Sequence, residues 1–126
     1  MICYLDTQVM VWLCQKQLEK LTPAAAAVLE ESEVLLSPMV LLELEYLYEI
    51  KRIIRAPQAL LQQLEAQIGL RLCDQSFAAI VQTALFETWT RDPFDRVIVA
   101  QAKSNGYAPL LTADSKIREH YPRSTW

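Results

Sequence analysis

Short apolar segments alternate with longer helical segments along the whole chain, and this alternation limits the folds that the sequence can adopt. Each apolar segment has the length and composition of a buried β-strand. The predicted strands are residues 2–6, 33–37, 70–73 and 109–112. Strands that alternate with helices are typical of a parallel sheet covered on both faces. We therefore predict a three-layer α/β/α sandwich around a central parallel sheet of four to five strands.

Local start and stop signals delimit the helices between these strands. Thr22-Pro23 and Ser37-Pro38 each place a capping residue before a proline at the first helical position. Asn105-Gly106 is a helix stop signal. The predicted helices are residues 7–17, 23–31, 38–54, 57–67, 76–89, 92–104 and 115–120.

Composition restricts the class of protein further. The chain has 126 residues, 52% of them hydrophobic and two of them glycine, which favours one compact domain over residues 1–126. No apolar run approaches the ~20 residues of a membrane helix, and no basic region precedes the first apolar stretch. We expect a cytoplasmic protein without a membrane partner. The three cysteines have no metal-type spacing, so we expect reduced thiols in the core.

Four acidic residues lie where the surrounding sequence is apolar. Asp6 and Asp114 close the first and last predicted strands, and Glu43 and Asp95 lie within helices that follow strands. A buried carboxylate is costly unless something pairs with it, and few cations lie alongside these four. The carboxyl ends of parallel strands, and the starts of the helices that follow them, meet at one edge of a sheet. The sequence therefore predicts that the four acids converge on a divalent metal.

Oxygen-rich sites select Mg²⁺ or Mn²⁺. Such an ion activates a bound water and stabilises charge on a phosphoryl oxygen, so hydrolysis of a phosphodiester is the reaction class that these residues suit. The only histidine, His120, lies in a polar tail and is not needed. The net charge of -3 is unusual for a nucleic-acid-binding protein, but bound metal reverses the local sign of a carboxylate cluster.

Several of these residues also fit simpler roles. Asp6 and Asp114 fit helix caps, and Asp92 fits an N-cap because proline follows it, which leaves Asp95 as the ligand. Asp92 then supports the metal ligands without binding the metal itself. Arg96 fits three roles: an ion pair with a site carboxylate, a contact to a substrate phosphate, or plain exposure. Thr7 and Thr112 fit either hydrogen bonds to the acids or capping. The three tryptophans, Trp12, Trp89 and Trp126, are assigned to packing.

Taken together, these motifs resemble PIN-domain ribonucleases, and more narrowly the VapC-type toxins of bacterial toxin–antitoxin pairs. The resemblance runs from residue 1 to about residue 120. The motifs that carry it are Tyr4-Leu5-Asp6-Thr7, Leu42-Glu43-Leu44, Asp92-Pro93-Phe94-Asp95-Arg96 with Ala100-Gln101-Ala102, and Leu111-Thr112-Ala113-Asp114.

The resemblance implies Mg²⁺- or Mn²⁺-dependent cleavage of RNA, commonly tRNA or other structured RNA. It implies Asp6 and Asp95 as the main metal ligands, Asp114 as a direct or water-mediated ligand, and Glu43 as a ligand of metal or water. It also implies a homodimer, and an antitoxin protein that covers the acidic site.

Two other readings remain open at this point. A strand that ends in Asp also opens haloacid-dehalogenase-like phosphatases, but their second Asp is replaced here by Gln8. A catalytically inactive PIN-like module that binds RNA or protein is the other reading. The presence of all four acids, Asp6, Glu43, Asp95 and Asp114, gives that reading no support.

Overall fold

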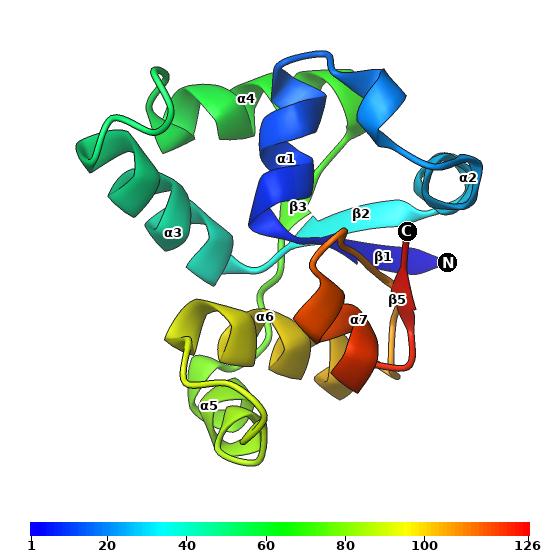
Figure 1. Cartoon of the computed structure of the whole chain (residues 1–126), viewed down its shortest axis with the longest axis vertical. Coiled ribbons are helices and arrows are strands. Elements are labelled where there is room, and N and C mark those ends of the chain that lie inside the picture. Colours follow the sequence, from blue (N-terminus) through cyan, green and yellow to red (C-terminus); the bar gives the residue numbers. More distant parts are fainter.

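The computed structural model describes residues 1–126 as a five-stranded sheet with seven α-helices around it (Figure 1). The strands are β1 Ile2–Leu5, β2 Glu33–Leu36, β3 Arg71–Leu72, β4 Leu110–Leu111 and β5 Ser124–Thr125. The helices are α1 Thr7–Cys14, α2 Pro23–Glu31, α3 Pro38–Glu49, α4 Pro57–Ile68, α5 Phe77–Ala84, α6 Pro93–Ser104 and α7 Ser115–His120. A 3₁₀ helix, Leu18–Lys20, follows α1.

All five strands are parallel, in the order β3-β2-β1-β4-β5. Tyr4 in the central strand lies opposite Leu35 of β2 and Leu110 of β4. Figure 1 shows α1, α2 and α4 on one side of the sheet and α5, α6 and α7 on the other, while α3 contacts both α4 and α6. The predicted α/β/α sandwich with a parallel sheet is confirmed.

The strand order reverses direction beside β1. The chain moves outward from β1 to β2 and β3, then returns to place β4 on the other side of β1 and β5 beyond it. Such a reversal separates the loops that leave the two neighbouring strands, and it opens a crevice at their carboxyl ends. Asp6 follows β1 and Asp114 lies just past β4, so both acids lie at this crevice.

Three helices end earlier than their sequences predict, and two of them, α1 and α3, stop in the same way. The α3 helix was expected to reach Ile54 but ends at Glu49, and α1 was expected to reach residue 17 but ends at Cys14. After α3, Lys51 has a φ of 63°, and the amide of Arg52 donates to the carbonyl of Leu47 at 2.8 Å. This is a Schellman motif. Glycine normally occupies its left-handed position, and Lys51 occupies it here.

The same motif closes α1. Lys16 has a φ of 57°, and the amide of Gln17 donates to the carbonyl of Trp12 at 2.9 Å.

The predicted extension of α5 to Trp89 is also wrong. That helix ends at Ala84, and the following turn carries the buried Glu87. The fifth strand, β5, lies beyond the last strand that the apolar pattern predicted. The pattern does not mark β5, because its two residues are only half-buried and only their pairing with β4 defines the strand.

The core combines one face of each helical layer with the sheet, and 28 buried residues form its main cluster. Cys3, Cys14 and Cys73 are all buried free thiols, as expected. Burial raises the pKa of the Cys3 thiol to about 11, so this thiol stays protonated and unreactive at neutral pH. None of the helices has the length and apolar character that crossing a membrane requires.

Candidate active site

A pocket of about 220 Å³ opens at the crevice between β1 and β4. It brings together all four acids that the sequence singled out, and Asp92 joins them. Its lining residues are Asp6, Thr7, Gln8, Glu43, Leu47, Asp92, Asp95 and Asp114. No lysine, arginine or histidine is among them. The pocket is therefore a concentration of five carboxylates without a cation.

Asp6 is the most deeply placed of the five, with 7% of its surface exposed. It caps α1, and its Oδ1 accepts a hydrogen bond from the amide of Thr7 at 2.8 Å. Its Oδ2 accepts a hydrogen bond from the hydroxyl of Thr112 at 2.7 Å. Both oxygens are thus oriented by groups of the first and fourth motifs.

Thr112 connects Asp6 with Asp114. The Thr112 side chain is fully buried, and its Oγ1 also accepts a hydrogen bond from the amide of Asp114 at 3.0 Å. Asp114 in turn caps α7, since its Oδ1 accepts from the amides of Lys116 and Ile117 at 2.9 and 3.0 Å. The Thr112 side chain lies behind the pocket, where it links the loops that follow β1 and β4.

Glu43 reaches the pocket from α3. Its Oε1 accepts a hydrogen bond from the hydroxyl of Thr7, which ties α3 to the start of α1. No hydrogen bond reaches its Oε2. Thr7 therefore orients this carboxylate and leaves one oxygen free to face the pocket.

The start of α6 supplies the remaining two acids. Asp92 caps this helix, and its Oδ1 accepts from the amides of Phe94 and Asp95 at 2.9 and 3.4 Å, so the predicted N-cap is confirmed. The carboxylate of Asp95 accepts no hydrogen bond. Arg96 forms no ion pair with any of the acids, and its Nε donates to the carbonyl of Thr90 at 2.9 Å. It does not line the pocket.

The electrostatic environment raises the pKa of three of these carboxylates. Burial is the main cause for Asp95 and raises its pKa to about 7, with further increases from the charges of Asp92, Asp6, Glu43 and Asp114. Burial also raises the pKa of Asp6 and of Glu43. Hydrogen bonds from Thr112 and Thr7 partly oppose the increase for Asp6, and one from Thr7 opposes it for Glu43. No basic side chain lowers any of these three pKa values.

The donor set fits a hard divalent cation. Carboxylate oxygens are the ligands that Mg²⁺ and Mn²⁺ prefer, and carboxylates that repel one another are stabilised when a cation lies between them. As the side chains stand, however, no three His, Cys, Asp or Glu residues come close enough together to hold an ion. Coordination therefore requires some of these carboxylate side chains to move closer together.

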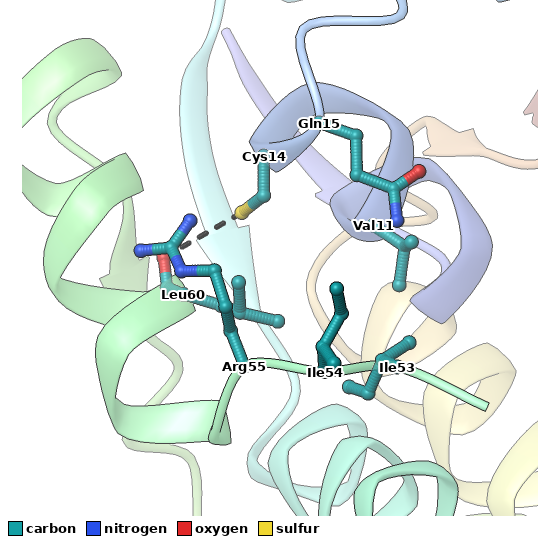
Figure 2. Close-up of a pocket in the computed structure, with 7 residues that line it drawn as sticks. All are labelled: Val11, Cys14, Gln15, Ile53, Ile54, Arg55 and Leu60. Atoms are coloured by element: carbon teal, nitrogen blue, oxygen red, sulfur yellow. Dashed lines mark hydrogen bonds between the residues drawn. The ribbon is translucent and has the colours of Figure 1, made fainter. Parts of the chain in front are cut away.

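A second cavity, of about 180 Å³, lies two turns along α1 from the acidic pocket and has a different character (Figure 2). Its lining is mostly aliphatic and contains no acid. The residues that line it are Val11, Cys14, Gln15, Ile53, Ile54, Arg55 and Leu60. Figure 2 shows the thiol of Cys14 hydrogen-bonded to the carbonyl of Leu60 at 3.7 Å, so this thiol joins α1 to α4. The cavity offers space for an apolar side chain but no catalytic group.

Sequence reasoning overlooked two residues of the acidic pocket, Gln8 and Leu47. Gln8 is an exposed side chain two residues after Asp6, and the only available signal was that closeness. Leu47 lies one helical turn after Glu43 on α3, where an apolar residue is ordinary. Neither residue has a chemical signature that distinguishes it in sequence.

The fold and the pocket define a class of protein: an α/β domain with carboxylates gathered at the point where its parallel strand order reverses. Within that class the chain belongs to the PIN domain family, whose model matches residues 3–121. This membership removes the haloacid-dehalogenase-like reading. No curated protein matches the sequence.

Solved structures of similar fold come from toxin–antitoxin complexes. VapBC2 from Rickettsia felis, bound to a promoter DNA fragment, matches with a TM-score of 0.64 and 21% identity over 98% of this chain and 96% of the other. A toxin–antitoxin complex from Klebsiella pneumoniae matches with a TM-score of 0.61 and 15% identity over the same shares of the two chains. VapBC-1 from nontypeable Haemophilus influenzae matches with a TM-score of 0.61 and 16% identity over 100% and 96%.

Proposed function

We propose that this protein is an Mg²⁺- or Mn²⁺-dependent endoribonuclease that hydrolyses phosphodiester bonds in tRNA or another structured RNA. One observation carries the proposal: a PIN domain gathers five carboxylates, and no cation, into one pocket at the reversal point of its sheet. Nuclease activity is typical of PIN domains. A protein that only bound RNA has no use for a cluster of charges that repels phosphate.

In the proposed site, Asp6, Asp95 and Asp114 hold the metal. Thr112 keeps Asp6 and Asp114 in register, and Asp92 supports Asp95 by fixing the first turn of α6. When bound, a divalent ion stabilises negative charge on the scissile phosphate and lowers the pKa of a coordinated water.

Glu43 has the role of orienting the attacking water. Thr7 holds one of its oxygens, and the other is free to accept a proton from a water molecule that faces the phosphorus. The water oxygen forms the new bond to phosphorus, one ester P–O bond breaks, and the leaving sugar oxygen takes up a proton from solvent. Because water rather than the ribose 2′-hydroxyl attacks, the products carry a linear phosphate and not a 2′,3′-cyclic phosphate.

We further propose that the protein is the toxin of a toxin–antitoxin pair and acts as a homodimer. The support for the toxin role is the shared fold with chains crystallised in toxin–antitoxin complexes, and the homodimer is what the resemblance to VapC-type toxins implies. The aliphatic cavity on α1, where Ile54 is 93% exposed, offers a second contact for an apolar side chain of an antitoxin that covers the acidic pocket. A short reading frame beside the gene, whose co-expression relieves growth arrest caused by this chain, is the expected genetic sign.

The test is cleavage of total tRNA by the purified protein, with and without Mn²⁺ or Mg²⁺, and with Asp6→Asn as the matched variant. We expect discrete fragments with linear phosphate ends that require both metal and Asp6, and a loss of rate of at least about 100-fold in the variant. Equal cleavage by the variant would show that the site is assigned wrongly. If the parent binds metal but cleaves neither tRNA nor other structured RNA, the inactive binding module is the correct reading.

A further inference from the structure

The carboxylate of Glu87 is buried outside the acidic pocket, and two groups of the protein hold it. Glu87, in the turn after α5, is 2% exposed. Its Oε2 accepts a hydrogen bond from the indole Nε1 of Trp89 at 2.6 Å, and its Oε1 forms an ion pair with Lys103 of α6. Both oxygens are engaged within the protein, so Glu87 has none to offer a ligand. A buried charge held by two partners fixes the position of both.

The indole that Glu87 holds reaches α7. The ring of Trp89 stacks on that of His120 with centroids 5.0 Å apart and an angle of 8° between the planes. The Nδ1 of His120 lies 2.9 Å from the carbonyl oxygen of Lys116, whose own amide donates to Oδ1 of Asp114. The contacts thus run from Glu87 through two stacked rings to the helix that Asp114 caps.

The same loop is fastened to the start of α6. Thr90 is buried, its hydroxyl accepts from the amide of Asp92 at 3.1 Å, and its carbonyl accepts from Arg96. The helices α6 and α7 share few close backbone contacts, and both contribute to the main core, α6 through Ile98 and Val99 and α7 through Ile117. The loop that carries Trp89 adds a polar and aromatic connection between the helix that bears Asp95 and the helix that follows Asp114.

We propose that Glu87, Trp89 and His120 form a brace that sets the separation of Asp95 and Asp114, and through it the affinity of the acidic pocket for its divalent cation. This inference rests on the proposed metal-dependent function. The three residues are positioning residues, because none of them lines the pocket.

The brace matters because the carboxylates repel one another. In the absence of a cation, any freedom between α6 and α7 allows Asp95 and Asp114 to move apart, and binding must then draw them together again. Groups that orient metal ligands from behind typically contribute 10- to 100-fold to metal affinity. Replacing a residue that serves packing alone lowers the melting temperature but does not change the metal affinity of the folded protein.

Mn²⁺ binding to the full chain, measured by electron paramagnetic resonance without RNA and well below the melting temperature, separates these two roles. We expect Trp89→Leu to raise the Kd for Mn²⁺ about 10-fold. Trp126→Leu is the matched control, because Trp126 is also half-buried and packs on Trp12 with centroids 5.4 Å apart, outside the pocket. We expect it to lower the melting temperature to a similar extent and to change the Kd less than twofold.

Two substitutions at the exposed His120 keep the test valid if Trp89→Leu does not fold. We expect His120→Ala to weaken Mn²⁺ binding as Trp89→Leu does, and His120→Phe, which keeps a stacking ring, to restore most of the affinity. Equal Kd values for the parent, Trp89→Leu and His120→Ala would overturn the brace and leave the nuclease intact. A parent that binds Mn²⁺ but cleaves no RNA refutes the nuclease alone, while a parent that binds no Mn²⁺ refutes both.

Discussion

At the scale of single residues, capping a helix and lining the pocket are compatible roles for one carboxylate. Asp92 and Asp114 each direct Oδ1 to backbone amides at a helix start, and their Oδ2 atoms take no part in the cap. Asp6 uses one oxygen for α1 and receives the hydroxyl of Thr112 at the other. A cap restricts the freedom of the carboxylate, so less ordering remains to be done when a metal binds.

Thr112 offers the sharpest test of this arrangement. Thr112→Val keeps the shape of the side chain but removes both the donor to Asp6 and the acceptor for the Asp114 amide. We expect a 10- to 100-fold loss of cleavage rate and about 1–3 kcal/mol of stability, since two buried polar groups lose their partner. Thr112→Ser keeps the hydroxyl and should retain most of both. Kinetics and thermal unfolding on the three proteins measure these effects, and a fully active valine variant would contradict them.

The sequence sufficed for the acids but not for the contacts that orient them. Asp6, Glu43, Asp95 and Asp114 could be found because carboxylates in apolar surroundings are costly without a partner. The bond between Thr7 and Glu43 joins residues 36 positions apart, and the ion pair of Glu87 joins the turn after α5 to Lys103 near the end of α6. Neither can be read from local pattern. Arg96, for which three roles were open, donates to a backbone carbonyl instead.

At the scale of the elements, the sequence predicted the helix starts and the ends of α2, α4, α6 and α7, but it did not predict the ends of α1, α3 and α5. Proline follows the capping residue at α2, α3 and α6, and each predicted start matches the structure within a residue. The ends of α1 and α3 are set by Lys16 and Lys51 in a left-handed conformation, which costs an L-residue about 1–2 kcal/mol. The hydrogen bonds of the two Schellman motifs hold these exposed lysines in the conformation that glycine adopts without strain.

Lys51→Gly should therefore stabilise the protein. Glycine adopts the required φ without strain at the Schellman position, so we expect an increase of about 0.5–1 kcal/mol in the free energy of unfolding. Lys51→Ala is the control, because it removes the charge but keeps the Cβ atom and the strain. Denaturant unfolding compares the three proteins, and an alanine variant as stable as the glycine variant would assign the effect to charge instead.

At the scale of the whole molecule, the topology explains why the acids lie together. The order β3-β2-β1-β4-β5 brings β1 and β4 side by side although more than 100 residues separate them. The predicted alternation of strands and helices was enough to place Asp6 and Asp114 at the same edge of the sheet. The adjacency of β1 and β4 came only from the structure, because strand order is a property of pairing and not of local pattern.

The burial of these carboxylates, together with their mutual repulsion, predicts an unusual pH dependence for the metal-free protein. Burial and neighbouring charges raise the pKa of Asp95 from its ordinary value of 3.8 to about 7 in the folded protein, and the pKa values of Asp6 and Glu43 are raised as well. Between about pH 4 and pH 7 the folded state therefore binds more protons than the unfolded state, so stability falls as the pH rises through this range. We expect the metal-free protein to melt at a lower temperature at pH 7.5 than at pH 5.

A divalent cation and a neutral substitution should each cancel this loss. If the pocket is the proposed metal site, saturating Mn²⁺ binds only its folded, ionised form and should raise the melting temperature at pH 7.5 by more than at pH 5. Asp95→Asn removes one of the repelling charges. We expect it to raise the melting temperature of the metal-free protein at pH 7.5 by about 3–5 °C, on the order of 1 kcal/mol once solvent screening is allowed for, and to abolish most of the response to Mn²⁺. Thermal melts at both pH values, with Mn²⁺ or with chelator, decide the point. A drop in melting temperature for Asp95→Asn at pH 7.5 would mean that this carboxylate stabilises the fold and that repulsion does not dominate the pocket.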